Sequence, residues 1–180
     1  NKKVIHGFPL SFKLDGKEIL GKPEGMHGMK LEAKVLFIVS LDQHLDHLIS
    51  AVESVGVEVE DIVAAPFAAS LVSLTKAQRT AGCVLANIGA ETVSIVIFEN
   101  DRPISLQVFP VGSTNITNDI ALGLQIPLEE AEEVKQGKDE NGEYSQKKLD
   151  DIIEARLKDI FDLIEAHLKK IHKNELLPAG

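Results

Sequence analysis

Residues 83–92 read Cys-Val-Leu-Ala-Asn-Ile-Gly-Ala-Glu-Thr, and this stretch decides the fold class of the chain. Its first part is a short, mostly apolar run, which is typical of a buried strand. A turn containing Gly89 follows, and residues 93–98 are again mostly apolar. The polar residues 99–101 and the run 103–109 then predict a hairpin. We therefore expect a sheet within an α/β protein.

Helical patterns follow this sheet. Residues 111–124 open with Val-Gly-Ser-Thr and predict a helix that Thr114 or Asn115 caps. Residues 128–135 predict a short helix. From 149 to 171 apolar residues recur at helical spacing, which predicts one long amphipathic helix.

The sequence before the sheet predicts a smaller α+β segment. Short strands are expected at residues 4–5 and 8–14, with a hairpin turn at Asp15-Gly16. A longer strand is expected at 29–40.

A helix capped by Asp42 should follow this segment, and an extended stretch is expected at 57–63. Residues 66–74 are rich in Ala and Ser, which suits a tightly packed helix. Thr75 can then cap a short helix that ends at Gly82.

Composition excludes several classes of protein. Hydrophobic residues make up 44% of the chain and charged residues 26%, as in soluble globular proteins. The net charge of −9 and the scarcity of aromatic residues argue against a nucleic-acid binder. One cysteine, Cys83, excludes an internal disulfide framework and fits a reducing cytoplasm. The N-terminus does not resemble a signal peptide.

Three short patterns are candidates for binding a nucleotide. The turn Asn87-Ile-Gly89-Ala-Glu-Thr92 can point backbone N–H groups and a hydroxyl at phosphate, although an ordinary hairpin turn is the alternative. Gly112-Ser113 opens a helix whose free N–H groups would favour an anion, or it is a plain helix start. Glu132 and Lys135 share one helix face and would hold ribose or adenine, or form a solvated ion pair.

No catalytic residue and no metal site is predicted. His44 and His47 have a spacing that can hold a metal, but a third ligand is not evident and a solvated helix face is expected. Cys83 begins a buried strand and is expected to belong to the core.

The order of these patterns resembles the FtsA family of bacterial cell-division proteins, which are actin-like ATPases. The matching stretches are collinear along the chain. Residues 25–34 resemble G-x-x-G-x-x-L-x-x-x-x-H, 75–82 resemble L-T-x-x-E-x-x-x-G, 111–121 resemble P-V-G-G-x-x-I-T-x-D-I-A, 131–135 match A-E-x-x-K, and 152–156 match I-I-x-x-R.

The resemblance implies part of an actin/Hsp70-like ATPase lobe preceded by a small α+β, SHS2-like subdomain called 1C. Residues 1–58 would form 1C, 59–81 would return to subdomain 1A, 82–113 would form 2A, and 114–180 would belong to 2B. By the same resemblance the chain begins within a subdomain and ends before the family's adenosine motif. We therefore expect that it does not turn over ATP by itself.

Partners and cofactors are also implied by the resemblance. The family binds ATP with Mg²⁺, here through the residues Asn87, Gly89, Thr92, Gly112, Ser113, Glu132 and Lys135. It binds the C-terminal tail of FtsZ, with Arg156 a candidate contact, and it assembles with itself through 1C. It is held on the cytoplasmic face of the inner membrane, at the division site, by a C-terminal helix that this chain does not contain.

The phosphate turn departs from the family pattern D-x-G-G-G-T. Asn87 replaces the Asp whose carboxylate would help to hold Mg²⁺ or its water shell. Glu91 adds a side chain and a negative charge where close approach to phosphate favours glycine. Weak binding of ATP is therefore expected, and whether the protein is an enzyme stays open.

Two alternatives remain. A PilM-like protein of type IV pilus assembly shares the inserted subdomain and the nucleotide lobe, and would bind a peptide of a membrane partner instead of FtsZ. An ATP-driven chaperone or a sugar-kinase-like enzyme is the other. The replacement of the family's Asp by Asn87 argues against it, and so does the lack of an evident catalytic base.

Overall fold

The computed structural model describes residues 1–138, 144–173 and 177–179. The chain forms two compact units. The first contains Asn1–Leu85, Val96–Leu106 and Pro178–Gly180, and the second contains Ala86–Ile95 and Gln107–Leu177. Helices and strands occur in both units, so the predicted mixed α/β class is confirmed. The subdomain boundaries expected from the family resemblance stay predictions.

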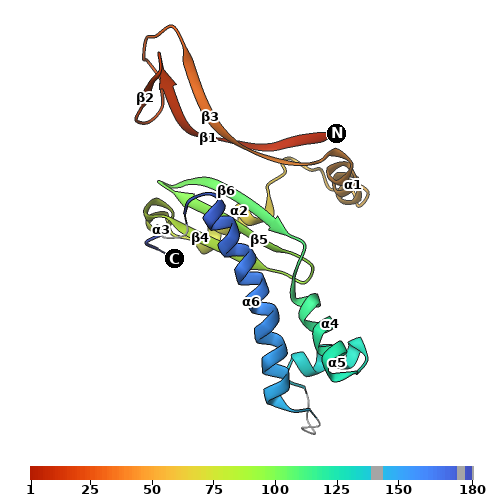
Figure 1. Cartoon of the computed structure of the whole chain (residues 1–180). Helices are drawn as coiled ribbons and strands as arrows, with labels where there is room; N and C mark the ends of the chain where they lie inside the picture. The colour runs from red at the N-terminus through yellow and green to blue at the C-terminus, as the bar shows by residue number, and fades with distance from the viewer. Residues whose placement is uncertain (139–143, 174–176, 180) are drawn as a thin grey trace. The chain divides into compact units, whose positions relative to one another are not determined.

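The first unit begins with a long antiparallel ribbon (Figure 1). Strand β1 (Lys2–Leu14) lies between β2 (Lys17–Ile19) and β3 (Leu31–Leu41) in the order β2-β1-β3. The turn from β1 to β2 uses Asp15 at φ 49° and Gly16 at φ 81°, as the Asp-Gly pair predicts.

Strand β1 is continuous, and the prediction of two short strands was wrong. Its pairing with β3 shifts register between Val4 and His6 and again between Pro9 and Ser11. Such bulges let a strand continue past residues that interrupt the regular pattern. Pro9, which lacks an N–H group, is therefore accommodated within the strand.

Three helices follow the ribbon in the first unit: α1 (Asp42–Glu53), α2 (Ala65–Ser73) and α3 (Lys76–Ala81). The prediction for α3 is confirmed, because Thr75 and Gln78 form a reciprocal capping box.

One prediction near α1 was wrong. Asp42 does not cap this helix: Leu41 is the capping residue, and Asp42 lies in the first turn, where its charge still favours the helix dipole. The extended stretch predicted at 57–63 is not paired, and the described residues between α1 and α2 contain no strand.

A second sheet has the order β4-β5-β6, with β4 (Cys83–Ile88), β5 (Val93–Glu99) and β6 (Arg102–Phe109). Strand β5 is buried from Val93 to Phe98 on both faces, as expected for a central strand. Strand β4 has the predicted bounds, but only Cys83 is buried and Ile88 is 43% exposed. The prediction of a fully buried strand was therefore wrong for β4.

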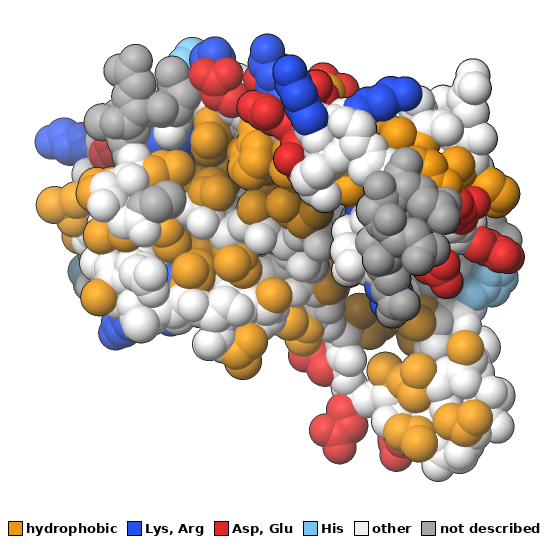
Figure 2. Space-filling view, turned by 90° about the horizontal axis from the view of Figure 1, so that it is seen from below, with side chains coloured by type: hydrophobic (Ala, Val, Ile, Leu, Met, Phe, Trp, Pro, Cys, Tyr) orange, Lys and Arg blue, Asp and Glu red, His pale blue; other side chains and the backbone are white. Residues whose placement is uncertain are grey.

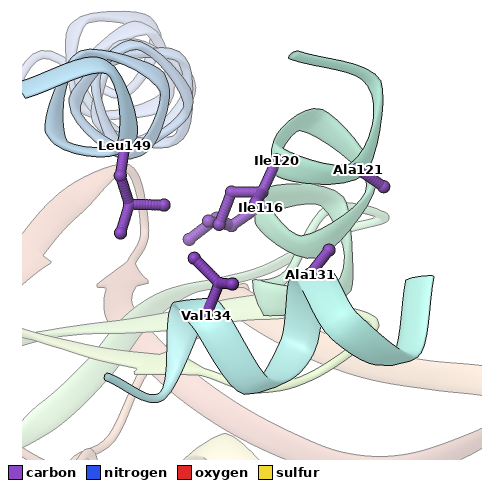
Figure 3. Packing of buried hydrophobic residues seen from close by; sticks show 6 residues of the cluster. All are labelled: Ile116, Ile120, Ala121, Ala131, Val134 and Leu149. Atoms are coloured by element: carbon purple, nitrogen blue, oxygen red, sulfur yellow. The ribbon is translucent and has the colours of Figure 1, made fainter. Parts of the chain in front are cut away.

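Helices α4 (Ser113–Leu124), α5 (Leu128–Lys135) and α6 (Gln146–Lys170) belong to the second unit. Figure 3 shows side chains of α4 pointing toward Val134 of α5 and Leu149 of α6. One buried hydrophobic cluster of this unit consists of Ile116, Ile120, Ala121, Ala131, Val134 and Leu149. The long amphipathic helix predicted from the apolar spacing is confirmed as α6.

Hydrophobic side chains are also exposed on the surface, and many are visible on the face shown in Figure 2. Val72 of the first unit is 88% exposed, and Leu122 and Phe161 of the second are 79% and 55% exposed. Among the described residues, no helix has the length and apolar character that crossing a membrane requires.

Candidate functional site

The predicted phosphate turn connects β4 to β5 within the second unit. Gly89 N–H donates to the carbonyl oxygen of Thr92 at 2.9 Å, which closes a tight turn. Asn87 and Thr92 are exposed at the two ends of this turn, and Gly89 is half-buried. The structure therefore brings the three predicted residues of the turn together, with two of them accessible to solvent.

The start of α4 packs directly on this turn. Ser113 N–H donates to Gly89 O, and Thr114 N–H donates to Ala90 O, each at 2.9 Å. Gly112 N–H donates to the Asn115 side-chain oxygen at 2.9 Å. These N–H groups were predicted to be free for an anion, and that prediction was wrong because the protein supplies their acceptors.

The capping of α4 also differs from the sequence prediction. Gly112 is the capping residue, where Thr114 or Asn115 was expected. Asn115 lies in the first turn and reaches back to the N–H of Gly112. This contact is one of the two hydrogen bonds of a capping box. The other would need a side chain on the capping residue, which glycine lacks.

Position 112 requires glycine because its backbone lies very close to the backbone of the turn. A Cβ atom at this position would lie 2.2 Å from Ala90 O, far inside van der Waals contact. The backbone of Gly112 is extended at φ −159°, which other residues adopt freely. The requirement for glycine is therefore steric, and it serves contact between α4 and the turn.

Glu91 makes a further contact between the turn and α4, which the sequence did not predict. The Thr114 hydroxyl donates to a carboxylate oxygen of Glu91 at 2.9 Å. Glu91 is exposed and Thr114 is half-buried. A carboxylate is thus held on the first turn of α4, where the helix dipole favours negative charge.

Glu132 and Lys135 of α5 form a network with α4. Lys135 Nζ donates to Glu132 Oε2 at 2.6 Å and to Thr117 Oγ1 at 2.8 Å, and it lies 3.4 Å from Ser113 O. The Thr117 hydroxyl also donates to Glu132 Oε2 at 2.6 Å. Glu132 and Lys135 do share one face of α5, as their spacing predicts.

The ion pair that was the alternative interpretation of this motif is present, and it is open to solvent on the side of Glu132. The Lys135 side chain is only 18% exposed, whereas Glu132 is 42% exposed. Hydrogen bonds from Lys135, Thr117 and Gln136 lower the pKa of Glu132 to about 2. Thr117 is a network residue that the sequence analysis missed, and its place in the I-T-x-D motif was the available signal.

Arg156 of α6 is bound to Asp119 of α4. Its Nε and Nη2 atoms donate to the two carboxylate oxygens at 2.6 and 2.9 Å, and Asp159 lies 3.6 Å from Nη1. The hydrogen bonds with Asp119 raise the pKa of Arg156. Two motifs of the sequence, I-T-x-D-I-A and I-I-x-x-R, therefore meet in one bidentate pair. A contact of Arg156 with a partner stays a prediction.

The donor atoms at the turn fit a magnesium ion poorly. Glu91 is the one carboxylate among residues 86–92, and it accepts a hydrogen bond from Thr114. Asn87 supplies a neutral amide oxygen, which Mg²⁺ binds less strongly than a carboxylate. Among the described residues, no group of three or more His, Cys, Asp and Glu side chains is arranged to hold a metal.

The remaining candidates of the sequence analysis lie in the first unit. His44 and His47 are both exposed on α1. Cys83 is 1% exposed and packs with Val96 and Phe98. Burial raises the pKa of the Cys83 thiol, which opposes formation of a reactive thiolate.

Comparison with protein families gives two matches. A family described as "Cell division protein FtsA" matches residues 84–175. A family described as "SHS2 domain inserted in FTSA" matches residues 1–39. The first match covers the phosphate turn and all three helices of the second unit, and the second covers most of the antiparallel ribbon.

Curated relatives agree with these family matches. The chain is 31% identical over 178 residues to a cell division protein FtsA of Bacillus subtilis, covering 87% of this chain and 40% of that protein. It is 32% identical over 135 residues to one of Pseudomonas aeruginosa, covering 75% of this chain and 32% of that protein. The chain thus spans less than half the length of these relatives.

Solved structures establish the fold. The chain aligns with a PilM-PilN type IV pilus biogenesis complex with a TM-score of 0.70 and 18% identity, over 95% of this chain and 46% of that one. It aligns with the ethanolamine utilization protein EutJ of Carboxydothermus hydrogenoformans with a TM-score of 0.53 and 22% identity, over 66% and 40%. The predicted partial actin-like lobe with an SHS2-like segment is confirmed.

Proposed function

Because the chain belongs to the FtsA family of bacterial cell-division proteins, we propose that it is part of an adaptor that binds the C-terminal tail of FtsZ. The whole protein would link FtsZ to the cytoplasmic face of the membrane at the division site and assemble with itself. Membership of a cell-division family supports a role in cell division. The contacts with FtsZ, with the membrane and with further copies are the proposal.

One face of α6 is the surface we propose for the FtsZ tail. Leu149, Ile160 and Ile164 are the buried side chains of this helix. The outer face carries an exposed stripe at helical spacing, formed by Glu154, Lys158, Phe161 and Glu165. Phe161 is the observation that carries the assignment, because an aromatic anchor surrounded by charged side chains is typical of a peptide-binding surface.

The ion pair of Arg156 supports this surface indirectly. Its bidentate contact with Asp119 holds α6 against α4, so the exposed stripe is presented by a fixed helix. A helix whose position is already fixed loses little conformational entropy when a peptide binds.

A substitution on the stripe tests this surface. Phe161→Ala removes the anchor without disturbing a buried side chain, and we expect about a tenfold loss of affinity for a labelled FtsZ tail peptide. Leu122→Ala is the matched control, because Leu122 is 79% exposed on α4 of the same unit. Equal affinities of the two variants would reject this surface.

ATP is proposed as a ligand from the family alone, whereas the turn offers poor donor atoms for the Mg²⁺ that accompanies it in the family. Asn87, Gly89, Thr92, Gly112 and Ser113 would lie on the phosphate side, and Glu132 and Lys135 on the nucleoside side. The carboxylate of Glu91 and the hydrogen bonds at the start of α4 make this a weak site.

A PilM-like role in type IV pilus assembly is the second candidate. The structural likeness to the PilM-PilN complex extends over 95% of this chain, so the two share a fold. At 18% identity the likeness concerns the fold alone. In this role the chain would bind a peptide of a pilus protein in place of the FtsZ tail.

A further inference from the structure

We propose that Glu91 keeps phosphate away from the start of α4, acting as an anion built into the protein. This inference rests on the proposed nucleotide site, which it deepens by naming the residue that limits its affinity. Three contacts carry it: Thr114 Oγ1 to Glu91, Thr114 N–H to Ala90 O, and Ser113 N–H to Gly89 O, each at 2.9 Å.

Local charge at this helix start opposes a phosphate. Glu91 bonds to Thr114, and Lys135, paired with Glu132, lies 3.4 Å from Ser113 O. Two carboxylates and one ammonium group therefore surround the first turn of α4, which leaves one net negative charge. A phosphate that approaches this turn is repelled by Glu91, since the charge of Lys135 is balanced by Glu132.

The position of Glu91 is fixed by the backbone beside it. Gly112 approaches Ala90 so closely that a Cβ atom would collide with its carbonyl oxygen. This contact holds the turn against α4, and Glu91 follows Ala90 directly in the sequence. The carboxylate is therefore presented to Thr114 by a turn that packs directly against α4.

Four variants of the full chain test the role of Glu91. Glu91→Gln removes the charge and keeps the shape, and Glu91→Ala removes the whole carboxylate. Thr114→Val removes the hydroxyl that holds Glu91 while it preserves the charge. Glu129→Gln removes an exposed carboxylate from the first turn of α5 and controls for net charge.

The measurement is an NMR titration of ¹⁵N-labelled chain with pyrophosphate, followed at the amides of residues 112–114. We expect Glu91→Gln to bind about tenfold more tightly than the original chain, and Glu91→Ala at least as tightly as Glu91→Gln. Thr114→Val should gain less than either, and Glu129→Gln should not differ from the original chain.

Three results would overturn the proposal: equal affinity of Glu91→Gln and the original chain, an equal gain in Glu129→Gln, or no pyrophosphate binding by any variant. Binding of the FtsZ tail peptide to the same samples tests the proposed function independently. A chain that binds the peptide while Glu91→Gln gains no affinity for pyrophosphate rejects the role of Glu91 alone.

Discussion

Gly112 illustrates how one residue joins a turn to a helix. The sequence predicts a glycine that opens a helix near phosphate, and the structure gives it a different task. The hydrogen bonds from α4 to Gly89 and Ala90 require backbones in close contact, which a side chain at position 112 would prevent.

Gly112→Ala should therefore destabilise the second unit by about 1–3 kcal/mol, because the added methyl group meets backbone that cannot move aside. Gly123→Ala is the matched control, since its Cβ would meet only the flexible end of Ile152, at 2.6 Å. Alanine also favours the helix at position 123. Urea denaturation of both variants measures the difference, and a Gly112→Ala variant as stable as the original chain would contradict the steric explanation.

Glu132 gives a prediction for pH. Its pKa is lowered to about 2 in the folded chain, below the value of about 4.3 expected when unfolded. The stability that its ionised form contributes is complete above the unfolded pKa and is lost as the pH falls toward about 2. A carboxyl titration followed by NMR should give a midpoint near that value, and a midpoint above 4 would show that the network with Lys135 and Thr117 does not form in solution.

Residues of the candidate site were predictable to the extent that motifs mark them. Asn87, Gly89, Glu132 and Lys135 lie where the motifs imply, on the turn and on α5. The contact of Glu91 with Thr114 was not predictable, because it joins residues 23 positions apart through a side-chain hydrogen bond. Sequence periodicity carries no information about such a contact.

Elements with a strong periodic pattern were predicted well. The bounds of α5 and β4 match the prediction, and α6 extends a few residues before the predicted start. The stretch 57–63 forms no strand, because apolar content alone cannot tell an unpaired segment from a strand, which needs a hydrogen-bonded neighbour. The capping of α1 was wrong by one position, a common error at helix ends.

The pair of Asp119 and Arg156 fixes α4 to α6, and we expect it to contribute more than a surface ion pair. Both side chains are less than one-third exposed, and the contact is bidentate. A double-mutant cycle with Asp119→Ala and Arg156→Ala should give a coupling energy above about 1 kcal/mol. The exposed pair Glu165 and Lys169 on α6 should give less than about 0.5 kcal/mol. Similar coupling in the two pairs would contradict a structural role for Arg156.

The whole chain folds into two compact units. Composition and hydrophobic patterns were sufficient to predict an α/β protein, and the collinear motifs were sufficient to predict the actin-like family. The division into units was not predictable, because each unit combines segments that are distant in the sequence. Long-range contacts of this kind follow from packing, which a single sequence does not reveal.

Direct peptide binding tests the proposal that this chain carries an FtsZ-binding surface. Fluorescence anisotropy of a labelled FtsZ C-terminal peptide is measured while the chain is added, with a peptide of PilN type as the control. We predict saturable binding of the FtsZ peptide, weakened by Phe161→Ala and unchanged by Leu122→Ala. Binding of the PilN-type peptide alone would contradict the division role and favour pilus assembly.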